Sequence, residues 1–84
     1  MTTYEKWKSG EMDWFIRQGL IRNAVVTYCR MYDEYLSQRK LGLNFMEAVE
    51  SSAEIMNTSP DTIRRAITES TLDSESPVHL NRAS

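Results

Sequence analysis

The chain has 84 residues, a length that suits one small domain and excludes a multidomain enzyme. Hydrophobic residues make up 40% of the sequence and charged residues 26%, and two Trp, four Tyr and two Phe give it the composition of a folding chain. The formal net charge of −2 at pH 7 excludes a uniformly basic nucleic-acid coat but is compatible with a local basic patch.

Side chains that support metal, redox or membrane chemistry are scarce. Cys29 is the single cysteine, so no intrachain disulfide can form, which predicts a protein of a reducing compartment, the cytoplasm. Because His79 is the single histidine, the usual zinc ligand sets cannot be assembled and a Cys–His nucleophile is not expected. No stretch approaches the roughly 20 apolar residues of a membrane span, and no apolar run follows the N-terminus. We therefore expect no metal, no cofactor, no enzymatic activity, no secretion and no membrane insertion.

The fold class predicted from these patterns is all-α: a small helical domain with a long N-terminal helix followed by a helix-turn-helix pair. Three Gly, two Pro and no alternating apolar and polar run leave little support for a sheet. Near the start, Thr2 and Glu5 match a capping box. This pattern predicts a short helix over residues 4–8, interrupted by Ser9 and Gly10.

A long helix is predicted over residues 11–40. Acidic residues in its first turn, and Arg39 and Lys40 in its last, suit the helix dipole, and Gly42 suits the position after its end. Gly19 is the position at which this helix would break or bend. Apolar residues recur along it at spacings of three and four, as on one face of a helix: Trp14, Ile21, Val25, Tyr28, Tyr32, Tyr35 and Leu36.

A second helix is predicted over residues 45–56. Asn44 is a good N-cap and Glu47 follows three residues later, which completes a capping-box pattern. We expect Asn57 to end this helix, because Asn tolerates the left-handed conformation better than most residues. The predicted inward side chains are Phe45, Val49, Ser52, Ala53 and Met56.

A third helix is predicted over residues 60–69. Ser59 can cap it, Pro60 suits the first helical position because its missing N–H had no partner there, and Asp61 meets the positive end of the helix dipole. The side chains expected to be buried are Ile63, Ala66 and Ile67.

The C-terminal residues are rich in Ser and lack periodic apolar side chains. We expect one helical domain over residues 1–68 and a polar tail over residues 69–84 that is partly disordered or docked. The side chains that would dock are Leu72, Val78 and Leu80.

The stretch from Ala53 to Ile67 resembles the helix-turn-helix of bacterial and phage transcriptional regulators. It has the small residue in the first helix, the Ser at the start of the second and the Arg-Arg-Ala run of that pattern. It departs from the pattern at Asn57, where Gly is usual, and at Thr58, where an aliphatic residue is usual. The similarity extends over residues 44–68 and implies that the second helix enters the major groove of double-stranded DNA.

The resemblance also implies which residues face the DNA. Arg64 and Arg65 would contact guanine or phosphate, and Ser59 and Thr62 would hold phosphates. The full set expected at the DNA is Ser59, Pro60, Asp61, Thr62, Arg64, Arg65 and Thr68, with Arg39 and Lys40 supplying further positive charge.

The charge of this segment favours binding as a dimer. Residues 44–68 hold two arginines and four acids, so a monomer is expected to bind DNA weakly and in a salt-sensitive way. A homodimer would bring two reading helices about 34 Å apart, which predicts a palindromic site. The aromatic stripe of the long helix provides the expected interface, although it would serve equally as intramolecular core. Its members are Trp14, Ile21, Val25, Tyr28, Tyr32 and Tyr35.

A capped helix pair also occurs in trihelical modules that dock proteins, so fold and function are separate questions here. The alternative function is a non-enzymatic adaptor or inhibitor of the phage or plasmid type, which binds a protein partner through its acidic surface. Taken alone, the arginine pair is also compatible with a solvated face.

Overall fold

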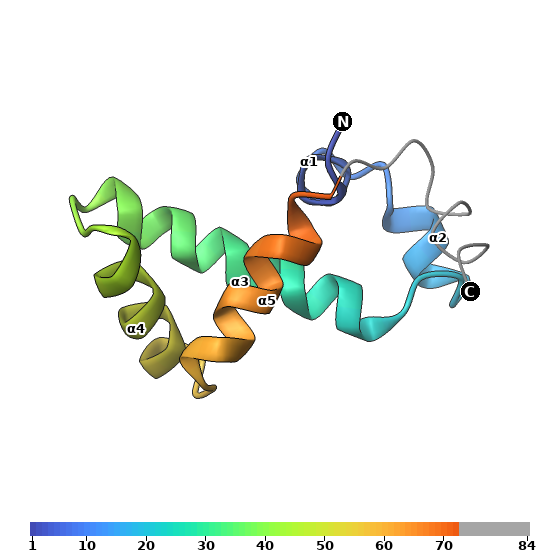
Figure 1. Ribbon diagram of the computed structural model, residues 1–84. Coiled ribbons are helices and arrows are strands. Elements are labelled where there is room, and N and C mark those ends of the chain that lie inside the picture. Colours follow the sequence, from blue (N-terminus) through green and yellow to red (C-terminus); the bar gives the residue numbers. More distant parts are fainter. Residues whose placement is uncertain (73–84) are drawn as a thin grey trace.

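The computed structural model describes residues 1–72, and within them it contains five helices and no strand, which confirms the all-α class (Figure 1). Val78 and Leu80, two of the three side chains expected to dock, lie outside the described residues. The helices, in chain order, are α1 (Thr3–Lys8), α2 (Asp13–Arg17), α3 (Asn23–Lys40), α4 (Phe45–Ile55) and α5 (Pro60–Ser70). None of these five helices is both long and apolar enough to cross a membrane.

Helices α3, α4 and α5 pack against one another and form the main body of the molecule. In Figure 1, α5 crosses in front of α3, and α4 lies beside them at the end of α3. Burial of apolar side chains where the three helices meet is the main stabilising term, because each fully buried large side chain contributes about 1.5–3 kcal/mol. The buried residues of this core are Met31, Val49, Ala53, Ile63 and Ala66.

The single long helix expected over residues 11–40 is wrong. Gly19 takes a left-handed conformation with φ of 74°, and Arg22 is extended, so the chain changes direction between α2 and α3. The Gly19 N–H donates to the Ile16 carbonyl at 3.0 Å and the Leu20 N–H to the Phe15 carbonyl at 2.9 Å, which closes α2 with a Schellman motif. The remaining helix, α3, has 18 residues and spans only about 27 Å.

The short N-terminal helix forms as predicted. The Thr2 hydroxyl accepts from the Glu5 N–H at 3.1 Å, and the Glu5 carboxylate accepts from the Thr2 N–H at 2.7 Å, so the capping box is complete. The helix ends at Ser9 and Gly10.

Helix α1 packs on α3 and α5 and ties the start of the chain to the last described residues. The Tyr4 hydroxyl donates to Asp33 of α3 at 2.5 Å, and the Thr3 N–H donates to the Leu72 carbonyl at 3.0 Å. Thr3 and Lys6 are buried on this helix. The N-terminal turn is therefore part of the folded unit.

Helix α4 begins and ends as the sequence predicts. Asn44 and Glu47 form a complete capping box, and Asn57 follows the helix in the left-handed conformation with φ of 55°. Of the five side chains expected to face inward, Phe45 is the exception, since 43% of it is exposed. It occupies the first position of the helix and lies against the edge of Tyr35, with ring centroids 6.0 Å apart.

Candidate nucleic-acid interface

The corner between α4 and α5 is closed by backbone hydrogen bonds. The Asn57 N–H donates to the Glu54 carbonyl at 3.2 Å, and the Thr58 N–H donates to the Ala53 carbonyl at 2.9 Å. Together with the left-handed Asn57, these bonds form a Schellman motif, which satisfies carbonyls at the end of α4 and turns the chain. The chain therefore turns sharply between α4 and α5, and Asn57 ends the first of these helices as expected (Figure 1).

The first turn of α5 is fixed by its cap. The Ser59 hydroxyl accepts from the Thr62 N–H at 3.2 Å and lies 2.9 Å from the Thr62 hydroxyl. Pro60 occupies the start of the helix, where it removes a donor that would have had no partner. Both hydroxyls expected to hold phosphates thus hydrogen-bond to each other, and Ser59 is exposed while Thr62 is half-buried.

Packing holds α5 on one side and leaves its other side to solvent. Ile63 and Ala66 are fully buried against the core, and they fix the orientation of the helix. The opposite side carries mostly polar residues from the first turn of the helix to the third. Those exposed to solvent are Pro60, Asp61, Arg64, Arg65 and Thr68.

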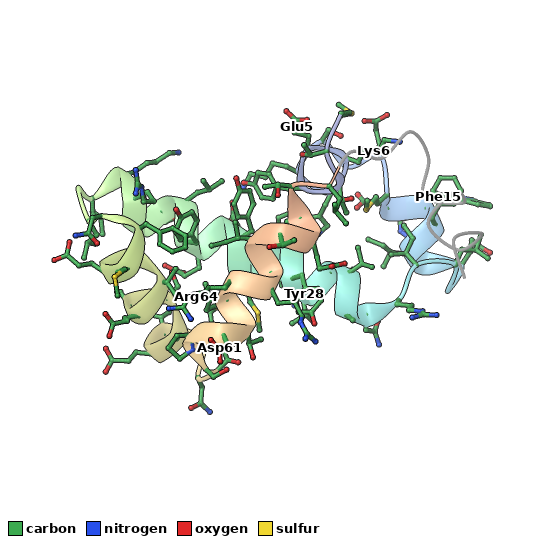
Figure 2. The ribbon with its side chains drawn as sticks, viewed as in Figure 1. Glu5, Lys6, Phe15, Tyr28, Asp61 and Arg64 are labelled. Carbon is green, nitrogen blue, oxygen red and sulfur yellow. The ribbon has the colours of Figure 1, made fainter. Side chains whose placement is uncertain are left out.

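The two arginines of α5 differ in their surroundings. Arg64 donates from Nη1 to Oδ1 of Asp61 at 2.7 Å, and Figure 2 shows the two side chains beside each other at the N-terminal end of the helix. The pair is open to water, with 49% of the Arg64 side chain and 91% of the Asp61 side chain exposed. Arg65 is also exposed and makes no ion pair with any residue of the described chain. One guanidinium is thus oriented by a carboxylate and the other projects alone.

Two carboxylates lie on α4 at the corner that leads into α5. Glu50 and Glu54 lie on the exposed side of α4 and help to line an open hollow of about 680 Å³ at the corner between α4 and α5. The other residues that line it are Ala53, Asn57, Thr58 and Pro60. These carboxylates make the hollow at the corner unfavourable for an anion.

Arg39 and Lys40 lie in the last turn of α3 and are exposed. They precede α4, whereas Ser59 follows it, so an 11-residue helix about 16 Å long separates the two groups. In Figure 1 the end of α3 and the start of α5 lie at opposite ends of α4.

The six side chains expected at a dimer interface have different environments. Ile21 is 5% exposed, and Tyr28 and Tyr35 pack against the core. Tyr32 lies edge-on to Tyr4 at 4.9 Å, and Val25 is half-buried. The sixth side chain is Trp14 of α2, which is 59% exposed and lies edge-on to Phe15 at 5.1 Å.

A series of aromatic rings joins α1, α3 and α4, a feature that the sequence reasoning missed. Trp7 contacts Tyr4, Tyr4 contacts Tyr32, Tyr32 stacks on Tyr35, and Tyr35 meets Phe45, with centroids 4.9 to 6.0 Å apart. The signal was the spacing of three residues within each of the pairs Tyr4–Trp7 and Tyr32–Tyr35, which places each pair on one helix face. These aromatic rings therefore contact one another within a single molecule.

Titratable groups in and beside this series have shifted pKa values. The hydrogen bond from Tyr4 lowers the pKa of Asp33, and Lys8, whose Nζ lies 3.2 Å from the Asp33 carboxylate, lowers it further. Burial raises the pKa of Tyr4, and its hydrogen bond to Asp33 raises it further. Burial also raises the pKa of the Cys29 thiol, which is fully buried, as expected for a small apolar side chain.

No protein-family model, curated protein or solved structure matches this chain. The helix-turn-helix resemblance over residues 44–68 therefore stays an expectation from the sequence. The case for a functional site rests on the geometry of the corner and on the chemistry of the exposed side of α5.

Proposed function

We propose that the protein is a small helix-turn-helix DNA-binding protein that regulates transcription, with α5 as the helix that enters the major groove. The observation that carries this proposal is the exposed pair Arg64 and Arg65 on a helix whose opposite side is anchored by buried Ile63 and Ala66. A helix fixed in this way can present guanidinium groups to base edges without a large loss of conformational entropy on binding.

The proposal includes a homodimer, because one subunit carries few cations for phosphate neutralisation. Two subunits double the number of phosphate contacts and bind half-sites about 34 Å apart. The exposed ring of Trp14 on α2, which lies edge-on to the half-buried ring of Phe15, is the aromatic surface that supports this part of the proposal. Light scattering at micromolar concentration tests it, and a monomer mass with and without duplex DNA contradicts it.

Fluorescence anisotropy on a labelled random-sequence duplex, measured across a salt series, tests DNA binding itself. We expect salt-sensitive binding that the double variant Arg64→Ala, Arg65→Ala reduces at least tenfold, since each lost charge-assisted contact costs about 1–3 kcal/mol. The matched control is Arg17→Ala, Arg30→Ala, which removes the same charge from exposed positions on α2 and α3. Absence of binding at low salt, or an equal loss in the control, contradicts the proposal.

An adaptor or inhibitor that binds a protein partner is the second candidate function. The observation that favours it is the open acidic hollow lined by Glu50 and Glu54 at the corner between α4 and α5. The double variant Glu50→Gln, Glu54→Gln separates the two functions. It strengthens binding to duplex DNA if α5 approaches phosphates, and it weakens capture of a basic protein partner if the hollow is the docking surface.

A further inference from the structure

The ion pair at the start of α5 offers a defined set of hydrogen-bonding groups. Arg64 uses Nη1 to hold Oδ1 of Asp61 at 2.7 Å, and both residues lie on the exposed side of the first two turns. A guanidinium has five N–H donors, so most of those of Arg64 remain for a ligand. The second carboxylate oxygen of Asp61 remains as an acceptor. The pair thus presents donors and an acceptor side by side.

This arrangement matches one base-pair edge in the major groove. A G·C pair displays two acceptors, guanine N7 and O6, followed by one donor, the cytosine N4 amino group. Arg64 supplies donors for the two acceptors and Asp61 supplies an acceptor for the amino group. On an A·T pair the same carboxylate would meet the O4 acceptor and the methyl group of thymine, which leaves a buried charge without a partner.

The carboxylate also lowers affinity for DNA in general. Asp61 is 91% exposed at the end of the helix that approaches the duplex, where it repels phosphates. Asp61 weakens binding to every duplex, but on a G·C pair its carboxylate gains a hydrogen bond from the cytosine amino group. It therefore increases the difference in affinity between duplexes with and without that base pair. Arg65 has no such carboxylate partner within residues 1–72 and would bind guanine or phosphate without this selectivity.

We infer that Asp61 and Arg64 act together as a reader of a single G·C base pair, so that the DNA ligand carries G·C under the first turn of α5. This inference rests on the proposed DNA-binding function. Arg64 donates to guanine N7 and O6, and Asp61 accepts from cytosine N4 while it holds the guanidinium in place. Asp61 is the specificity-determining residue of this reader, and Arg64 provides the affinity.

Selection of a random duplex library by the full-length protein, followed by anisotropy on the selected duplexes, tests the inference. The wild-type protein should enrich sites with one fixed G·C position, and replacement of that pair by A·T should weaken binding about tenfold or more. Asp61→Asn should bind random duplex more tightly and reduce this G·C preference at least fivefold. The matched control Glu69→Gln removes one acid from the exposed end of the same helix, and it should keep the preference.

The outcomes distinguish this inference from the proposed function. If the wild-type protein binds duplex DNA and Asp61→Asn keeps the same G·C preference, the reader is wrong while DNA binding stands. If selection yields sites without a fixed G·C position, the reader is equally overturned. If no duplex binds at low salt, both proposals fail. Circular dichroism of Asp61→Asn confirms that a changed preference does not come from loss of the helix.

Discussion

The chain has two corners, one at Gly19 and one at Asn57, and each is closed by a Schellman pattern of two backbone hydrogen bonds. At Asn57 the chain enters a capped helix whose inner side, with Ile63 and Ala66, is fully buried. At Gly19 it enters a segment that reaches α3 through Arg22, which makes no side-chain cap bond, and the preceding helix carries the exposed Trp14. Helix α2, which precedes the Gly19 turn, buries none of its residues, whereas α5, which follows the Asn57 turn, is anchored by Ile63 and Ala66, so the motif alone does not determine how firmly a helix is held.

Truncation of one apolar side chain in α5 and one in α2 should give the largest difference in the free energy of unfolding. Ile63→Ala is expected to lower the free energy of unfolding by about 3 kcal/mol, because it leaves a cavity in the core beneath α5. Trp14→Ala should lower it by less than about 1 kcal/mol, because 59% of Trp14 is already in water. Urea denaturation followed by circular dichroism measures both. Equal losses would show that α2 is as firmly packed as α5.

Substitution of the left-handed residues compares the two corners directly. Gly19→Ala should destabilise the protein by about 1–2 kcal/mol, since a Cβ is strained at φ of 74° even though nothing lies within 4 Å of it. Asn57→Gly should change stability by less than about 1 kcal/mol, because relief of strain and greater freedom of the unfolded chain oppose each other. Thermal unfolding of the two variants checks this. A stabilising Gly19→Ala would contradict the turn described at Gly19.

Removal of the cap of α5 should have a smaller effect. Ser59→Ala is expected to cost about 1 kcal/mol, because the N–H of Thr62 loses its side-chain acceptor and keeps only the Ser59 carbonyl. The matched control is Arg22→Ala at the start of α3, where no side-chain cap bond exists, and it should cost less than about 0.5 kcal/mol. Urea midpoints of the two variants provide the comparison. A larger loss of stability in Arg22→Ala than in Ser59→Ala would contradict the stabilising role of the Ser59 cap.

Much of the α4–α5 corner could be predicted from the sequence because its signals are local. Asn44 caps the start of α4, and Asn57, Ser59 and Pro60 follow one another closely at the corner, so each signal acts on its immediate neighbours in the chain. The break before α3 was harder to place. Apolar residues continue at helical spacing on both sides of it, and Gly19 alone marks it, so the pattern of a single helix persists through the bend.

The details of the candidate site depend on side-chain contacts that sequence spacing does not determine. A spacing of three residues allows Asp61 and Arg64 to pair, but it does not exclude a free guanidinium of the kind that Arg65 retains. Likewise, the periodic tyrosines of α3 could face another subunit or another helix. Helix α1 places Tyr4 against Tyr32, a contact that joins segments far apart in the sequence.

The smallest expected effect concerns pH and the contact between α1 and α3. Because the Tyr4 hydrogen bond lowers the pKa of Asp33 below its ordinary value of 3.8, ionised Asp33 stabilises the fold above that value and loses this contribution as the pH falls through the folded pKa. Asp33 is partly exposed, so the effect should stay below about 1 kcal/mol. Urea midpoints at neutral and acidic pH should show that Asp33→Asn is less stable than wild type at neutral pH only. A difference that persists in acid would contradict this sign.

Amide chemical-shift mapping of the isotope-labelled protein against a duplex from the selected library tests the central claim most directly. If α5 is the helix that enters the major groove, the largest shifts will fall on residues 59–68, and the amides of α1 and α2 will move little. Shifts concentrated on the acidic side of α4, or no shifts at low salt, would contradict DNA binding through α5.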